Sequence, residues 1–201
     1  MKEMTKSECR MTKGAFTLIE LLVVISIIAV LAGLLVPTVQ SVLDRAKKVQ
    51  AKNDLTQIVT AVNAFYTEYG RYPTTMTTAD ATYGFGTGVT KSDALFNELR
   101  NAGGPLNTRQ IVFISPAEDK TIANPKGKIG SDGQFYDPWG FAYSIRIDAD
   151  YDNQVTNPYT ADTGAGPGTL RQGVIGWSVG KDKALGNSGS FTGSDDVISW
   201  Q

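Results

Sequence analysis

The sequence predicts an α+β protein: one long N-terminal helix, membrane-spanning in its first half, packs on a small antiparallel sheet with a loop-rich C-terminal part. Three observations lead to this prediction. Residues 16–36 are almost wholly apolar. Apolar residues then recur at helical spacing as far as Tyr69, and Gly70 follows as a residue suited to end a helix. Further along, short stretches alternate apolar and polar residues, which is typical of strands.

The composition excludes several classes of function. The 201 residues carry a formal net charge of −1, which argues against nucleic acid as a partner because phosphate binding needs a basic face. The chain contains no histidine, so histidine-based catalysis and histidine–metal sites are excluded. The one cysteine, Cys9, rules out an intramolecular disulfide and a zinc ion held by a cysteine cluster.

The first 36 residues have the organisation of a membrane anchor. Residues 1–15 are polar and rich in lysine and arginine, so the positive-inside tendency places the N-terminus in the cytoplasm. The apolar run of 16–36 is long enough for a membrane span, which needs about 20 residues. A simple signal anchor or a secretory signal peptide is the alternative. A secretory signal, however, has its small-residue cleavage site after the apolar region, whereas Gly14-Ala15 precedes it here, so the helix would survive cleavage.

Glu20 lies inside this apolar run and needs an explanation. A carboxylate within a membrane helix costs about 2.5–3.5 kcal/mol on insertion-based scales, so it is normally retained for a partner or a function. If the chain is cut before Phe16, Glu20 lies about one helical turn from the new amino group. The positive N-terminus of a neighbouring subunit could then neutralise Glu20 and set the register of stacking.

Residues 14–24, with the sequence Gly-Ala-Phe-Thr-Leu-Ile-Glu-Leu-Leu-Val-Val, resemble the prepilin processing motif of type IV pilins and type II secretion pseudopilins. The resemblance implies that a membrane peptidase cuts between Ala15 and Phe16 and then methylates the amino group of Phe16. Glu20 becomes the fifth mature residue, and Pro37 occupies a position where this family often has a helix-kinking proline. The residue before the cut is usually glycine in the family, whereas this chain has Ala15 there and Gly14 one residue earlier.

These features divide the chain into four parts. Residues 1–15 form a cleaved leader, 16–37 the membrane-spanning half of the helix, 38–70 its soluble half, and 71–201 a globular head. Within the head, we expect a loop over 74–90, a short helix capped by Ser92 or Asp93, an apolar strand or its approach at 111–114, and strands near 141–147 and 173–179. The segments 69–75 and 137–140 resemble the major pseudopilins in particular.

Two acidic clusters in the head could hold a hard cation through oxygen ligands. Asp148, Asp150 and Asp152 alternate as at the start of an EF-hand loop, but Asn153 replaces the usual glycine and Tyr159 the final glutamate, so a simpler calcium loop or a polar turn are the two interpretations.

The second cluster lies in the segments 178–182 and 194–200, which resemble the calcium-binding C-terminal loop of major pseudopilins. That resemblance implies Ca²⁺ bound by the carboxylates of Asp182, Asp195 and Asp196, with help from the Val179 carbonyl.

The resemblance implies a structural subunit of a type II secretion pseudopilus rather than an enzyme. The expected partners are further copies of this chain, other pseudopilins, the prepilin peptidase and an inner-membrane assembly platform. The chain would cross the inner membrane once, with its head on the extracytoplasmic side, before entering a periplasmic or surface filament. Type IV pilins and minor pseudopilins share the N-terminal motif and stay as the alternative, although the missing C-terminal disulfide loop favours the secretion system. A membrane-anchored enzyme and an adhesin on a pilin stalk are more remote alternatives.

Overall fold

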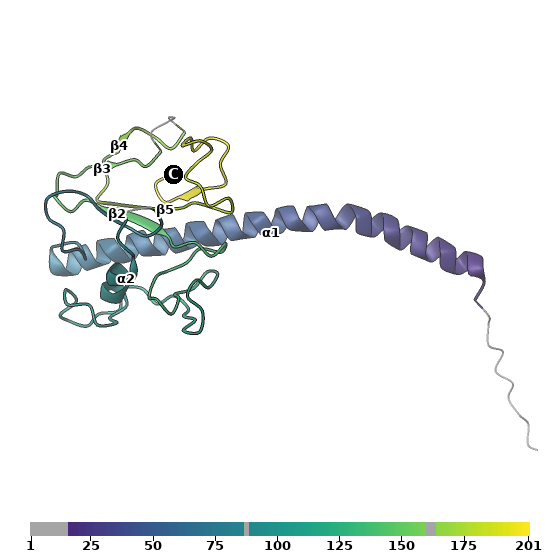
Figure 1. Ribbon diagram of the computed structural model, residues 1–201, viewed down its shortest axis with the longest axis horizontal. Coiled ribbons are helices and arrows are strands. Elements are labelled where there is room, and N and C mark those ends of the chain that lie inside the picture. The colour runs from purple at the N-terminus through teal and green to yellow at the C-terminus, as the bar shows by residue number, and fades with distance from the viewer. Residues whose placement is uncertain (1–15, 87–88, 160–163) are drawn as a thin grey trace, which may run out of the picture. The chain divides into compact units, whose positions relative to one another are not determined.

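The computed structural model describes residues 16–86, 89–159 and 164–201, and for residues 35–38 it describes the backbone only. The predicted leader, with Ala15, lies outside the described residues. Two compact units follow one another along the chain, the first ending at Leu43 and the second comprising Asp44–Gln201. Figure 1 traces the elements from the purple N-terminal helix to the yellow C-terminal strand.

The long helix α1 (Leu18–Tyr69) has 52 residues and passes through Pro37 without interruption. It ends where Gly70 takes a left-handed φ of 67° and donates its N–H to the Tyr66 carbonyl at 2.8 Å, which confirms the predicted end. The described apolar side chains between Phe16 and Leu34 are all exposed. By length and composition this stretch could cross a membrane, as predicted.

The C-terminal part of α1 buries one face in the head. Ala51, Leu55, Ile58, Val62 and Phe65 recur every three or four residues and are fully buried. This apolar stripe confirms the prediction that the long helix packs on the sheet of the head. Figure 1 shows the sheet lying alongside this part of α1.

The main sheet has four antiparallel strands in the order β1-β2-β5-β6. These strands are β1 (Ala81–Tyr83), β2 (Ser144–Ile147), β5 (Val174–Ser178) and β6 (Val197–Ile198). In the centre, Gly176 of β5 pairs with Ile145 of β2. A Cβ at Gly176 would lie 3.1 Å from Leu55 Cδ2, so glycine allows the sheet to approach α1 closely.

A second core lies on the other face of β5. Ile175 and Trp177 pack there with Val155 and Tyr159 from the region of the two-stranded sheet β3 (Val155–Thr156) and β4 (Thr169–Leu170). Val174, by contrast, belongs to the core beside α1. All residues of β5 are buried, because both faces of this strand are covered.

The C-terminal end of the chain is tied to α1 by one lysine. Lys52 Nζ donates to the carbonyl oxygens of Ile198 at 2.8 Å and Ser199 at 3.4 Å, and it also contacts the Gln201 oxygen. Its partial burial lowers the pKa of the Lys52 ammonium. The Lys52 ammonium thus satisfies backbone carbonyls at the end of the edge strand β6 and just after it.

The short helix α2 (Asp93–Leu99) forms where it was predicted, with Ser92 at its N-cap position. The expected side-chain cap was wrong, because Ser92 Oγ is buried and has no hydrogen-bond partner among the described residues. The expected strands at 141–147 and 173–179 are present but shorter than predicted. The expected loop over 74–90 contains β1, a strand of three residues that is too short to show a period of its own.

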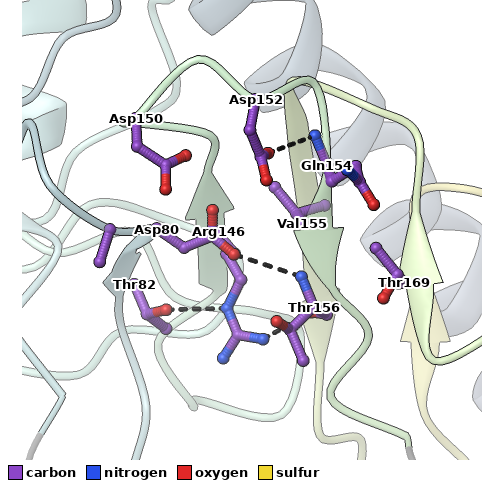
Figure 2. A pocket seen from close by; sticks show the side chains of 10 residues that line it. Asp80, Thr82, Arg146, Asp150, Asp152, Gln154, Val155, Thr156 and Thr169 are labelled. Atoms are coloured by element: carbon purple, nitrogen blue, oxygen red, sulfur yellow. Dashed lines mark hydrogen bonds between the residues drawn. The ribbon is translucent and has the colours of Figure 1, made fainter.

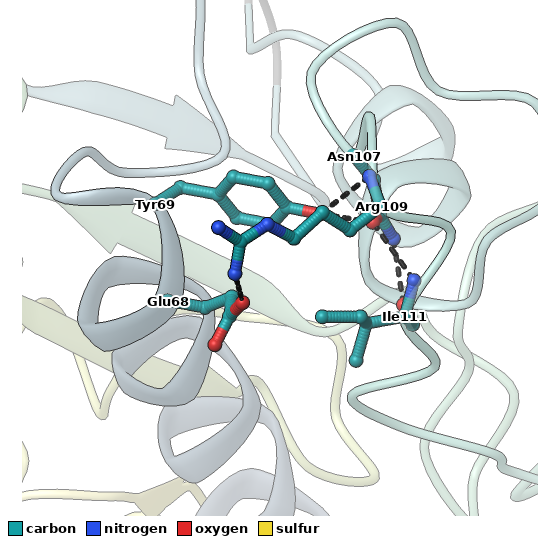
Figure 3. Close-up of polar contacts among 5 residues, drawn as sticks. All are labelled: Glu68, Tyr69, Asn107, Arg109 and Ile111. Atoms are coloured by element: carbon teal, nitrogen blue, oxygen red, sulfur yellow. Dashed lines mark hydrogen bonds and ion pairs between the residues drawn. The ribbon is translucent and has the colours of Figure 1, made fainter.

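Residues 111–114 do not form a strand, which corrects the prediction. Their backbone finds other partners: the N–H groups of Phe113 and Ile114 both donate to the Leu99 carbonyl at the end of α2. The Asn107 side chain accepts the Ile111 N–H at 3.0 Å and donates to the Ile111 carbonyl at 2.6 Å, while Asn107 itself accepts the Tyr69 hydroxyl (Figure 3). With these groups satisfied, no strand partner is needed.

The packing of α1 gives a first testable prediction. Leu55→Ala removes a fully buried side chain from the contact with Gly176 and should lower the free energy of unfolding by about 2–5 kcal/mol. Denaturant unfolding of the detergent-solubilised mature chain measures this change. Thr56→Ala, at the neighbouring exposed position, is the control and should change stability by at most about 0.5 kcal/mol. Equal midpoints for the two variants would contradict the proposed role of this stripe.

Candidate functional site

The described chain begins with a reciprocal cap at the start of α1. Glu20 Oε2 accepts the Thr17 backbone N–H at 2.8 Å and the Thr17 hydroxyl at 2.7 Å. In return, Glu20 donates its N–H to Thr17 Oγ1 at 3.3 Å. This arrangement is a capping box, which satisfies the free N–H groups of a helix N-terminus. The Glu20 side chain is exposed, so a positively charged group of another molecule could reach its carboxylate in addition to Thr17.

The three C-terminal carboxylates that the sequence singled out lie together in space. Oxygens of Asp182, Asp195 and Asp196 all lie within 4.8 Å of one another. Asp182 follows β5 in the chain, and the other two immediately precede β6. Asp182 is exposed, Asp195 half-buried and Asp196 buried, so the cluster extends from the surface inward. Val179, the residue whose carbonyl was expected to help, is buried directly after β5.

Each carboxylate of this cluster accepts at least one donor from its own loop. Ala184 N–H donates to Asp182 Oδ1 at 2.9 Å, and Lys181 N–H to Asp195 Oδ2 at 2.5 Å. Asp196 Oδ2 accepts two donors, the Gly186 N–H at 2.7 Å and the Tyr159 hydroxyl at 2.6 Å. The loop backbone therefore holds three like charges close together.

Two observations indicate that these residues fit a hard cation. Asp196 Oδ1 is buried and has no hydrogen-bond partner in the described part of the chain, and an unpaired buried carboxylate oxygen is costly. Gly180, at φ 67°, leaves space that Asp195 fills, because a Cβ there would lie 2.6 Å from Asp195 Cγ. Carboxylate oxygens are the ligands that Ca²⁺ prefers in proteins, and a cation would compensate the clustered charge.

The electrostatics of Asp196 agree with this assignment. Burial raises the pKa of the Asp196 carboxyl above its ordinary value. The hydrogen bonds from Tyr159 and Gly186 oppose that rise, and the charges of Asp195 and Asp182 add to it. A negative charge at Asp196 is therefore unfavourable on its own, and a bound cation would favour it.

The alternative cluster needs a correction. The structure groups Asp148 and Asp150 with Asp80 and not with Asp152. Figure 2 shows that Asp152 Oδ1 instead accepts the Gln154 N–H, at 2.8 Å. Asp80 adjoins β1, which pairs with β2 just before Asp148, and this long-range pairing places it there. Both oxygens of Asp148 accept backbone N–H groups from residues 152 and 153. The loop is a turn bonded to its own backbone, and Asp80, Asp148 and Asp150 form a second group whose oxygens could hold a cation.

Arg146 lies in the same region and ties the two sheets together (Figure 2). Its Nε donates to Thr82 Oγ1 at 2.9 Å, and its Nη1 donates to the Thr156 carbonyl at 2.5 Å. Asp80 accepts the Thr156 N–H at 3.2 Å. Asp80 and Arg146 therefore join β3 to β1 and β2, which gives them a structural use.

The structural role of Asp137 was not predicted from the sequence. This fully buried carboxylate accepts the N–H groups of Trp139, Gly140 and Phe141 on Oδ1, and the Ser178 hydroxyl on Oδ2 at 2.6 Å. Burial raises the pKa of Asp137, and these bonds oppose the rise. The segment 137–140 was noticed only as a resemblance, and its turn-forming Asp and Gly were the available signal. Asp137 thus holds the residues that lead into β2 against Ser178 at the end of β5.

Several parts of the chain match known proteins. Residues 10–36 match the prokaryotic N-terminal methylation motif. The chain is 41% identical over 66 residues to the type II secretion system core protein G of Pseudomonas aeruginosa, a stretch that covers 33% of this chain and 46% of that relative. It is 28% identical over 145 residues to the core protein G of Aeromonas hydrophila, which covers 72% of this chain and 92% of the relative.

A type IV pilin is also among the relatives. The chain is 40% identical over 57 residues to the type IV major pilin protein PilA of Myxococcus xanthus, covering 28% of this chain and 26% of that pilin. No solved structure matches the chain. The chain spans about half the length of the Pseudomonas core protein G but nearly all of the Aeromonas one. These matches confirm the resemblance to type IV pilins and type II secretion pseudopilins. The similarity to the Aeromonas core protein G extends beyond the N-terminal helix into the head.

Proposed function

We propose that this chain is a structural subunit of a type II secretion pseudopilus, anchored in the inner membrane until it assembles into a helical filament. The observation that carries the proposal is the methylation motif at residues 10–36, which leads directly into the exposed apolar half of α1. Apolar side chains that leave a bilayer need another dry environment, and a bundle of such helices provides one. Repeated contacts that do not close into a ring generate a filament.

The proposed assembly depends on Phe16 and Glu20. Processing between Ala15 and Phe16 by the prepilin peptidase would create a positive amino group beside the Thr17–Glu20 cap. The exposed Glu20 carboxylate could then pair with the amino group of a neighbouring subunit. Other pseudopilins and an inner-membrane assembly platform are the further partners in this proposal, and the head lies on the extracytoplasmic side.

A type IV pilin of a surface pilus is the second candidate function. The similarity to the Myxococcus pilin favours it, but that match covers only 28% of this chain. The longer match to core protein G covers 72% and supports the secretion system. A structural role, in either filament, is proposed in place of the membrane-anchored enzyme.

Processing gives a direct prediction. Intact mass and N-terminal sequencing of the chain from its host should show a mature protein that begins at Phe16 with one added methyl group. A strain without the prepilin peptidase should yield the uncut chain, which is the control. A chain cut after the apolar run would contradict the proposal, because it would leave no helix to assemble.

The ion pair gives a second prediction. Glu20→Gln keeps the side-chain shape but removes the charge, so the fraction of chain in sheared filaments should fall at least about tenfold. Ser26→Ala is the matched control, since Ser26 lies in the same apolar stretch and its hydroxyl bonds only within the helix, to the Val23 carbonyl at 2.7 Å. If Glu20→Gln assembles as well as the control, the pairing of Glu20 with the Phe16 amino group is wrong.

We further propose that Asp182, Asp195 and Asp196 bind Ca²⁺, with the Val179 carbonyl as a fourth ligand group. The ion would neutralise the clustered charge and staple the loop between β5 and β6, in a mature chain without cysteine. The unpaired Asp196 Oδ1 supports this proposal, and the missing Cβ of Gly180 allows Asp195 to lie beside the loop backbone.

Removal of Ca²⁺ with a chelator tests the proposed cation site. With Ca²⁺ at about a hundredfold its Kd, the melting temperature of the mature chain should exceed that in EDTA by about 5–10 °C. Asp196→Ala and Gly180→Ala should lose this difference, the first by deleting a ligand and the second by displacing Asp195. Asp150→Asn, in the other cluster, is the control and should keep it. A melt that is the same with and without chelator would overturn the calcium proposal, and loss of the difference only in Asp150→Asn would move the site.

A further inference from the structure

We propose that Tyr159 is a positioning residue of the cation site: its hydroxyl turns the Asp196 carboxylate so that the free oxygen faces the cation. The inference rests on the proposed binding of Ca²⁺ by Asp182, Asp195 and Asp196. Tyr159 belongs to neither of the two segments that carry those carboxylates. It follows β3 in the chain, 37 residues before Asp196, and is fully buried.

The two oxygens of Asp196 have different surroundings. Oδ2 accepts both the Tyr159 hydroxyl at 2.6 Å and the Gly186 N–H at 2.7 Å. Oδ1 is equally buried but has no hydrogen-bond partner among the residues described. Two donors on one oxygen fix the rotation of a carboxylate, which leaves Oδ1 as the oxygen free to accept a cation. Asp196 would therefore bind a cation through Oδ1 alone.

Tyr159 is itself held rigidly, as a positioning group must be. Its ring packs edge-on against Phe191, with centroids 5.3 Å apart, and lies 6.2 Å from the Trp200 ring. Its backbone N–H donates to Asn157 Oδ1 at 3.0 Å. The amide of Asn157 in turn donates to the carbonyl oxygens of Ala165 and Pro167. The phenol is thus in place before any ion arrives.

The direction of the effect follows from this geometry. Without the hydroxyl, Asp196 Oδ2 keeps only the Gly186 N–H, and the carboxylate gains freedom to rotate away from the other ligands. Changes to groups that orient a metal ligand typically weaken metal binding by 10–100-fold. We therefore expect Tyr159→Phe to raise the Kd for Ca²⁺ about tenfold or more.

The experiment compares two tyrosines in the detergent-solubilised mature chain. Tyr143→Phe is the matched control, because the Tyr143 hydroxyl also donates to a carboxylate, Asp54 Oδ2, at 2.8 Å, and its ring is also fully buried. Competition with a chromophoric chelator gives the Kd for Ca²⁺, and melting in EDTA gives the stability of the metal-free chain. Both variants should melt lower than wild type in EDTA, but only Tyr159→Phe should bind Ca²⁺ more weakly.

The outcomes distinguish failure of the positioning role of Tyr159 from failure of the proposed Ca²⁺ site. Equal or tighter Ca²⁺ binding by Tyr159→Phe, beside a wild type that binds, overturns the positioning role alone. A wild type that binds no Ca²⁺ overturns the cation site and the inference together.

A spectroscopic measurement covers the case in which Tyr159→Phe does not fold. The wild-type chain is labelled with 3-fluorotyrosine, and its ¹⁹F spectrum is followed during a Ca²⁺ titration. One tyrosine resonance should shift in parallel with site occupancy, because the Tyr159 hydroxyl bonds a ligand carboxylate directly. A spectrum that stays unchanged through saturation would overturn the inference.

Discussion

The fold depends on the burial of one face of α1. The side chains of Leu55, Ile58 and Phe65 are fully enclosed by the head, whereas the apolar residues before Leu34 are exposed. The C-terminal part of this continuous helix packs within the head, whereas the described apolar side chains of its first half are exposed. Two parts of the head cover that face: the sheet approaches at Gly176, and α2 adds Leu95 and Phe96 to the same core. Because the exposed apolar stretch finds no partner within the described chain, a membrane or other helices must supply one.

Buried carboxylates are used in two different ways in this head. Asp137 and Glu98 each accept several donors, and for Glu98 these are the N–H groups of Leu106 and Asn107. Their charge organises backbone that has no regular structure, much as ladder bonds would. Asp196 differs, because one of its oxygens is left without a donor. The contrast is the reason that the C-terminal cluster, and not the loop around Asp148, carries the calcium proposal.

The sequence predicted the elements that carry a long enough pattern. The stripe of α1 recurs over many turns, and β2 and β5 are four and five residues long within longer stretches that have a strand-like pattern, so periodicity finds them. Strands β1, β3, β4 and β6 have only two or three residues, and pairing with neighbours, not local pattern, defines them. The same limit explains which residues of the candidate site could be predicted. Asp182, Asp195 and Asp196 were found by resemblance, but Asp80 and Tyr159 reach their clusters through tertiary contacts that spacing along the chain does not reveal.

The bond from Lys52 to the carbonyls after β6 has a mechanical consequence. Ile198, whose carbonyl Lys52 holds, is two residues from Asp196. A pull along α1 relative to the head would therefore load β6 through this lysine, in addition to the central strands that α1 reaches through Leu55 and Asp54. The edge strand and the Asp195–Asp196 segment before it share that load path, so whatever stiffens this segment would also stiffen the joint through which force passes from the helix into the head.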